Sequence, residues 1–153
     1  MSNLQERKHY DVITCLFSSI GYLKTEQKLK RAFGSFASHL NPGGIIIIEP
    51  WFAPDAFKVG SPHMTTYDSK KLKIVRMNVS KKKGNLSILD MHWMVAEQGK
   101  DVLHFVDHHE LLLTPIPQLR LFMEEAGLNV IFLKKGTNVD GRDRLVGIKR
   151  NGA

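Results

Sequence analysis

Apolar and polar residues along the first 50 positions follow the pattern of a strand, a helix and a second strand. Residues 10–17 (YDVITCLF) are mostly apolar and rich in β-forming side chains, which predicts a buried strand. Thr25 then offers a helix N-cap, and apolar side chains recur at helical spacing at Leu29, Phe33, Phe36 and Leu40. Asn-Pro-Gly-Gly at 41–44 should end this helix. Four isoleucines at 45–48 then predict a strand buried on both faces, in a parallel pair with the first strand.

The last 40 residues show a similar pattern. A helix is expected to begin at Thr114-Pro115 and to end at Gly127. Two apolar runs, 128–133 (LNVIFL) and 144–149 (RLVGIK), then predict two strands that complete an α/β scaffold.

The middle of the chain has a different period. From about residue 64 to residue 113 there are three or four extended runs in which apolar and polar side chains alternate. Turns are expected at 83–85 (KGN) and 98–100 (QGK). A period of two predicts antiparallel strands with one packed face. The sequence therefore indicates an antiparallel sheet inserted into an α/β scaffold.

Composition narrows the class of protein. The 153 residues carry 22 basic and 15 acidic side chains, a formal net charge of +7. Such a balance suits an anionic partner, but a lysine-rich solvated surface explains it better, so nucleic acid is not expected. The longest purely apolar run is only four residues, so no membrane span is expected, and the first residues lack the apolar region of a signal peptide. A single Cys15 in an apolar stretch is typical of a reduced thiol in a cytoplasmic protein.

Two segments stand where an open α/β sheet binds ligands, beyond the carboxyl ends of its strands. Residues 16–22 (LFSSIGY) offer hydroxyls and backbone N–H groups, and residues 49–52 (EPWF) offer a carboxylate and an indole. Either segment is also compatible with an ordinary turn. The acidic and histidine side chains at 104–110 lack the convergent spacing of a metal site, so no metal is expected. Neither a glycine-rich phosphate loop nor a GxSxG elbow is present.

Five segments together resemble a known family. They read YDVITCLFSSIGYL, HLNPGGIIIIEPWFAPDAF, RMNVSKKKGNLSILDMHW, HELLL and FMEEAGL. They are similar to class I S-adenosylmethionine-dependent methyltransferases, in the branch of the dTDP-amino-sugar N-methyltransferases. The resemblance implies the C-terminal half of a Rossmann-like α/β fold, strands four to seven of the family sheet with an inserted antiparallel sheet. The family's Gly-rich cofactor loop would precede this part.

The resemblance also implies a division of the chain. Residues 1–50 would be a partial methyltransferase core, and residues 51–113 an inserted antiparallel sheet that caps the substrate. Residues 114–153 would supply the C-terminal helix and the last two strands of the core.

Site residues follow from the same resemblance. Cofactor contacts are implied for Cys15, Leu16, Phe17 and Ser18. Substrate contacts are implied for Ser19, Tyr22, Glu49, Trp51 and Arg142, with Arg144 as a competitor of Arg142. Tyr22 is the catalytic candidate, at a position where the amino-sugar enzymes have histidine, and tyrosine is a weak base near neutral pH.

The expected function is therefore that of a truncated S-adenosyl-L-methionine-dependent methyltransferase. It would transfer a methyl group to nitrogen or oxygen of a small molecule such as an amino sugar. The alternative is a non-catalytic remnant that acts as a dimerisation or binding module. We expect the isolated chain to bind cofactor poorly and to be inactive, and we expect the inserted sheet to form a homodimer.

Overall fold

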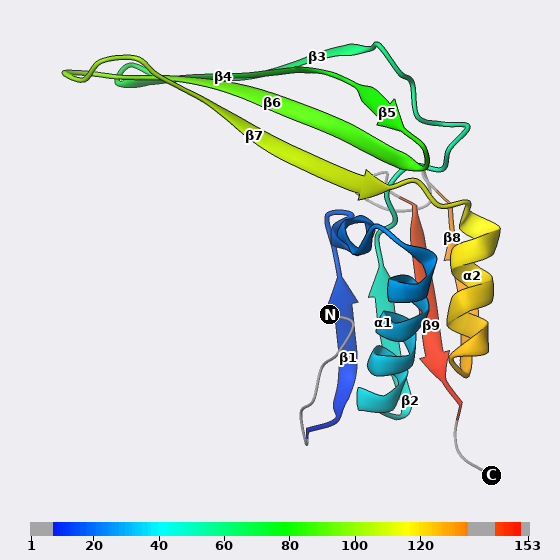
Figure 1. The fold of residues 1–153 in the computed structure, drawn as a ribbon. Coiled ribbons are helices and arrows are strands. Elements are labelled where there is room, and N and C mark those ends of the chain that lie inside the picture. Colours follow the sequence, from blue (N-terminus) through cyan, green and yellow to red (C-terminus); the bar gives the residue numbers. More distant parts are fainter. Residues whose placement is uncertain (1–7, 135–142, 151–153) are drawn as a thin grey trace.

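The computed structural model describes residues 8–134 and 143–150, which form two sheets and the helices beside them. The first sheet has the order β1 (Tyr10–Cys15), β2 (Leu40–Ile48), β9 (Arg144–Lys149) and β8 (Leu128–Leu133). Strands β1 and β2 are parallel, and β9 runs antiparallel to both of its neighbours (Figure 1). The predicted βαβ unit and both C-terminal strands are thus confirmed.

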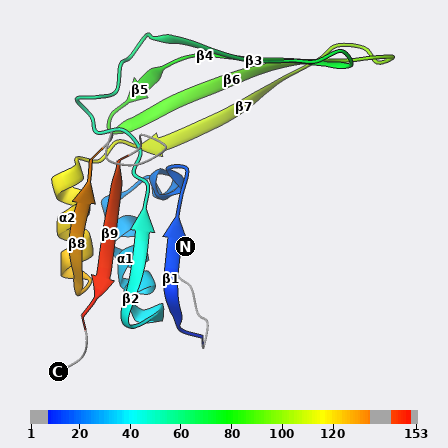
Figure 2. The ribbon, with the colours of Figure 1, turned by 180° about the vertical axis from the view of Figure 1, so that it is seen from behind.

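Two α-helices cover one face of this sheet. Helix α1 (Glu26–His39) joins β1 to β2, and α2 (Ile116–Glu125) precedes β8. Figure 2, seen from behind, shows the strands in front of both helices. Thr25 caps α1 as predicted, since its side chain accepts a hydrogen bond from the Lys28 N–H. Neither helix of the described part is long and apolar enough to cross a membrane.

The prediction of burial on both faces of β2 was only half right. Ile46 and Ile48 are completely buried beneath the helices, in a core with Phe33, Leu128 and Leu145. Ile45 and Ile47 point to the opposite face and are half-buried. The physical reason is that both helices of the described part lie on the same side of the sheet.

The segment after α1 also differs from expectation. The Asn-Pro-Gly-Gly segment ends the helix, but it belongs to β2, which begins at Leu40. The pairing register shifts between Tyr10 and Val12, where Tyr10 pairs with Leu40 and Val12 with Ile45. The four residues 41–44 are accommodated as an irregularity within the strand pair.

The second sheet is wholly antiparallel. It contains β3 (Pro62–Asp68), β4 (Leu72–Val79), β6 (Leu86–Glu97) and β5 (Lys81–Lys83), paired in that order. Strand β7 (Leu103–Leu112) pairs along β6. The sequence predicted at most four extended runs. The additional strand is β5, whose three lysines fold back on β6 through Gly84 in the left-handed region, at φ 57°.

This second sheet does not have the one packed face that its alternating pattern predicted. It projects away from the first sheet as a long ribbon (Figure 1). Met64 and Met94 on one face are exposed, and so are Leu103 and Phe105 on the other. Alternating side chains along these strands therefore point to opposite faces of the sheet, but far from the first sheet neither face is buried.

The two sheets meet at one end of each. The carboxyl ends of β1 and β2 point toward the second sheet (Figure 1). A short 3₁₀ helix, η1 (Ser19–Leu23), follows β1 and lies beside the end of β7. This junction places residues from both predicted ligand segments next to the second sheet.

Candidate functional site

The turn after β1 is held in an unusual backbone conformation. Phe17 and Ser18 have φ of 52° and 59°, in the left-handed region that non-glycine residues seldom adopt. The Phe17 N–H donates to Glu49 Oε2 at 2.7 Å, and the Ser18 hydroxyl donates to the Pro50 carbonyl at 3.0 Å. The segment after β2 thus fixes the turn after β1, as expected of neighbouring parallel strands.

Glu49 is the centre of this arrangement. It is 5% exposed, and its other carboxylate oxygen lies 3.3 Å from Nη2 of Arg144, at the start of β9. A buried carboxylate needs such partners, because removing its charge from water is costly. Glu49 therefore joins three strand ends, those of β1, β2 and β9.

Gly21 lets η1 approach the second sheet closely. A Cβ at this position would lie 3.1 Å from Leu111 Cβ and 3.3 Å from Trp51 Cβ. The Trp51 indole N–H donates to Ser87 Oγ at 2.8 Å, and the Ser87 hydroxyl donates to the Leu111 carbonyl at 3.1 Å. Trp51 is thus part of the junction between the two sheets.

Tyr22 takes part in a three-residue hydrogen-bonded chain. Its Oη lies 2.6 Å from Nδ1 of His109, and Nε2 of His109 lies 2.9 Å from Oδ2 of Asp107. Burial, and secondarily the charge of Asp107, raise the pKa of Tyr22, so the phenol keeps its proton at neutral pH. Sequence reasoning missed His109 and Asp107 as partners of Tyr22. The available signal was their alternation on one face of β7, but nothing local placed that face against η1.

Cys15 has no reactive setting. Its thiol is buried, lies 3.2 Å from the Ser19 hydroxyl, and has its pKa raised by burial. A nucleophilic thiol requires the opposite shift. No group of three or more metal-ligating side chains occurs among residues 8–134 and 143–150.

A cavity of about 450 Å³ opens between the second sheet and the segment after β2. Its lining combines aromatic, aliphatic and cationic side chains, among them Trp51, Phe57, Lys58, Arg76, Leu89 and Met91. Leu89 and Met91 of β6 are the cross-strand partners of His109 and Asp107. The cavity lining thus includes the cross-strand neighbours of His109 and Asp107, but not Tyr22, His109 or Asp107 themselves.

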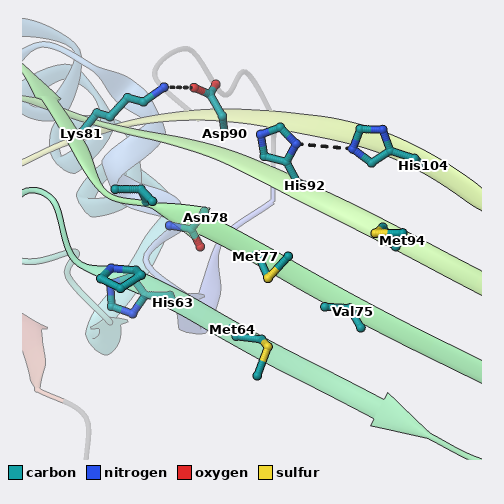
Figure 3. Close-up of a pocket in the computed structure, with 12 residues that line it drawn as sticks. His63, Met64, Val75, Met77, Asn78, Lys81, Asp90, His92, Met94 and His104 are labelled. Atoms are coloured by element: carbon teal, nitrogen blue, oxygen red, sulfur yellow. Dashed lines mark hydrogen bonds and ion pairs between the residues drawn. The ribbon is translucent and has the colours of Figure 1, made fainter.

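The opposite face of the second sheet carries a larger groove of about 750 Å³ (Figure 3). Its lining is rich in methionine and histidine, with Met64, Met77, Met94, His63, His92 and His104 labelled in the figure. The rings of His92 and His104 are parallel, with Nδ1 and Nε2 3.4 Å apart. At one end the Lys81 ammonium lies 2.9 Å from Asp90.

No protein-family model matches the sequence. The curated relatives, however, agree with one another. The chain is 35% identical over 150 residues to dTDP-3-amino-3,4,6-trideoxy-alpha-D-glucopyranose N,N-dimethyltransferase of Streptomyces venezuelae, covering 97% of this chain and 62% of that protein. It is 32% identical over 140 residues to dTDP-4-amino-2,3,4,6-tetradeoxy-D-glucose N,N-dimethyltransferase of Saccharopolyspora spinosa, covering 92% of this chain and 55% of that protein.

Solved structures give the same answer. The crystal structure of Streptomyces venezuelae DesVI superposes with a TM-score of 0.90 at 33% identity, over 97% of this chain and 62% of DesVI. The sugar N-methyltransferase KedS8 from Streptoalloteichus superposes with a TM-score of 0.84 at 27% identity, over 98% of this chain and 60% of KedS8. The chain is homologous to the sugar N-methyltransferases. It spans about three fifths of the length of these relatives, and the class I methyltransferase fold predicted from the sequence is confirmed.

The predicted site residues that the structure describes fall into two groups. Leu16, Phe17 and Ser18 form the turn between Cys15, the last residue of β1, and Ser19, the first of η1, and Glu49 binds this turn. Tyr22 and Trp51 instead form hydrogen bonds to the second sheet. Arg142 lies outside the described residues. Arg144, its competitor, points to Glu49.

The turn after β1 offers a partial fit for S-adenosylmethionine. The side chains of Leu16 and Phe17 are exposed at the carboxyl end of β1, where they present apolar surface. The Phe17 N–H, however, already donates to Glu49. The described residues therefore fit the apolar part of such a cofactor, and the sequence has no GxGxG loop to hold its polar end.

Proposed function

We propose that this chain forms the acceptor-binding part of an S-adenosylmethionine-dependent methyltransferase that methylates nitrogen or oxygen of a small molecule. The observation that carries the proposal is the homology to N,N-dimethyltransferases of dTDP-linked amino sugars, over nearly the whole chain. Their names supply the proposed acceptor class, an amino sugar carried on a nucleotide diphosphate.

The chemistry of the 450 Å³ cavity supports this acceptor. Lys58 and Arg76 supply positive charge for a diphosphate, and the rings of Trp51, Phe52 and Phe57 supply flat apolar surface for a base or sugar. A cavity with apolar walls and a few charged groups is typical of small-molecule sites.

Roles for the junction residues follow. Leu16 and Phe17 would contact the apolar part of S-adenosylmethionine, with Cys15 and Ser18 shaping the turn beneath them. When bound, S-adenosylmethionine supplies an activated methyl group on a sulfonium. Tyr22 would contact the reacting end of the acceptor, which its exposure of 47% permits.

Three other residues of the predicted substrate set would support the site without contacting the acceptor. Ser19 forms a hydrogen bond with the Cys15 thiol, and Glu49 and Trp51 hold the turn and η1 in place. In this proposal residues 51–113 form the cap over the acceptor, while residues 1–50 and 114–153 belong to the core.

Calorimetric titration with a dTDP-amino sugar tests the acceptor site. Arg76→Met should weaken binding by about tenfold, the expected loss for one charge-assisted contact to a phosphate. Arg120→Met on α2 removes a cation from a distant helix surface and should have no effect. Absence of binding by the wild-type chain, or equal losses in the two variants, would contradict the proposal.

A parallel titration with S-adenosylmethionine tests whether the chain holds cofactor by itself. We expect weak binding, because the sequence has no GxGxG loop to hold the polar end of the cofactor. Micromolar affinity would overturn this part of the proposal.

A second role is favoured by the outer groove of the second sheet. Met64, Met77 and Met94 line it and are exposed, and apolar surface of this extent is typical of a protein interface. We propose that this face forms a homodimer.

Analytical ultracentrifugation tests the dimer. Met77→Lys should shift sedimentation toward the monomer, while Leu121→Lys on the exposed face of α2 should not. A wild-type chain that stays monomeric at high concentration would refute the dimer.

The one cysteine of the sequence supports the proposal that this protein is cytoplasmic. Cys15 is buried and unpaired, as is common for thiols of proteins in a reducing compartment.

A further inference from the structure

The hydrogen-bonded chain Tyr22–His109–Asp107 has a direction. The Asp107 carboxylate only accepts hydrogen bonds, so the Nε2 of His109 that faces it at 2.9 Å carries the hydrogen. In the neutral imidazole the other nitrogen, Nδ1, is then an acceptor. It lies 2.6 Å from Tyr22 Oη, so the phenol hydrogen points at His109.

This direction leaves the Tyr22 oxygen with free acceptor capacity and no hydrogen to donate elsewhere. The phenol stays protonated, since burial and the charge of Asp107 raise its pKa. Lys24, next to η1, and Glu110 of β7 are two nearby charged groups, and they pair with each other at 2.6 Å. They do not compete for the Tyr22 hydroxyl.

We propose that Asp107 and His109 set the polarity of Tyr22, so that the site selects acceptors that present an N–H or O–H donor. This inference rests on the proposed function and deepens it. Tyr22 is the residue that touches the acceptor, and His109 and Asp107 are positioning residues that act through it.

The polarity suits methyl transfer. An amine attacks a methyl group with its nitrogen lone pair, so a hydroxyl that donated a hydrogen bond to that nitrogen would occupy the reacting pair. A hydroxyl oxygen that accepts from the amine N–H leaves the lone pair free and orients it. The location also suits this role, because the cross-strand partners of His109 and Asp107 line the 450 Å³ cavity.

The first test reads the histidine directly. Nitrogen-15 NMR of the chain should show that Nε2 of His109 carries a hydrogen and that Nδ1 does not. Asp107→Asn should raise the share of the Nδ1–H tautomer, because an amide can donate where a carboxylate cannot, whereas Asp101→Asn in the exposed β6–β7 connection should not. A doubly protonated ring, an Nδ1–H tautomer in the wild type, or an unchanged tautomer in Asp107→Asn would overturn the proposal.

The second test reads selectivity. Two dTDP sugars are compared by calorimetry, one with an amine and one with hydrogen in its place. The wild-type chain should prefer the amino sugar by roughly tenfold, as expected for one half-exposed hydrogen bond. Tyr22→Phe and Asp107→Asn should reduce the preference below about twofold, and Tyr67→Phe, an exposed tyrosine of β3, should retain it.

The outcomes separate the two proposals. If the wild type binds neither sugar, the proposed function fails and this inference fails with it. If both sugars bind equally to the wild type, the acceptor site stands and only the polarity of Tyr22 is refuted.

Discussion

The two sheets of this chain use their apolar residues in opposite ways. In the first sheet, one set of apolar side chains lies beneath α1 and α2 and is completely buried, namely Ile46 and Ile48 of β2, Leu128 of β8 and Leu145 of β9. In the second sheet, apolar side chains on both faces of β3, β4, β6 and β7 remain exposed. The comparison teaches that the first sheet is stabilised by its own core, whereas the apolar surface of the second is available for a ligand or a partner.

The largest expected effect contrasts two phenylalanines. Phe33 in α1 is 0% exposed and Phe105 in β7 is 42% exposed. Phe33→Ala should lower the free energy of unfolding by about 3–5 kcal/mol, because it leaves a cavity in the core. Phe105→Ala should cost less than about 1 kcal/mol. Urea unfolding measures both free energies. Equal losses of stability would show that the apolar side chains of the second sheet contribute as much to folding as those of the first.

The next effect concerns Glu49 and Arg144, which tie the strand ends of the first sheet at the junction. Arg144→Gln should cost about 2 kcal/mol, since it leaves the Glu49 carboxylate buried with one charged partner fewer. Arg120→Gln breaks an exposed pair on α2 and should cost at most about 0.5 kcal/mol. A cost for Arg144→Gln as small as that of Arg120→Gln would mean that Glu49 is satisfied without the arginine.

Two glycines sharpen the comparison with effects of opposite sign. Gly21→Ala forces a Cβ against Leu111 and Trp51 and should destabilise the junction by about 1 kcal/mol or more. Gly34→Ala, in an open position of α1, should stabilise the protein by about 1 kcal/mol through helix propensity. Thermal unfolding reports both changes, and a stabilised Gly21→Ala would contradict the close contact of the two sheets.

The smallest effect is the pH dependence of an ion pair on the second sheet. The His108 hydrogen bond, with a further one from Lys81, lowers the pKa of Asp90 from 3.8 to about 2, and Asp90 in turn raises the pKa of His108. The Asp90 contribution to stability is present above about pH 4 and is lost as pH falls through 2. The His108 contribution is present below pH 6.5 and is lost as pH rises through its raised pKa.

Asp90→Asn should therefore reduce the urea midpoint most between about pH 4 and 6.5, with a smaller difference on either side. The pair lies at the protein surface, with His108 exposed and Asp90 half-buried, so solvent screening keeps the effect small. Asp101→Asn is the matched control. A difference that grows steadily above pH 7 would have the wrong sign for this pair.

Much of the fold was predictable from local pattern. The helix over Glu26–His39, its Thr25 cap and the strands at 128–133 and 144–149 follow from periodicity and turn residues. The partial exposure of Ile45 and Ile47 was not predicted, because a continuous apolar run does not show whether other elements cover both faces of a strand. For the same reason alternation in β6 and β7 did not predict a face that stays exposed.

The site was predictable in part. Segments 16–22 and 49–52 were located as strand ends, and their contact through Phe17 and Glu49 agrees with a parallel pair. The partners of Tyr22 were not predictable. His109 lies 87 residues further along the chain, and most strands of the second sheet lie between the two residues in the sequence.

By itself, then, the sequence determined the elements, the α/β class and the family resemblance, since periodicity and local motifs are short-range properties of the chain. Only the tertiary structure decided that η1 lies against β7 and that Tyr22 meets His109 at 2.6 Å. It also decided that Glu49 serves the turn after β1 as a buried acceptor. The physical reason is that these contacts join residues far apart in the chain, and their geometry depends on how two sheets pack across Gly21.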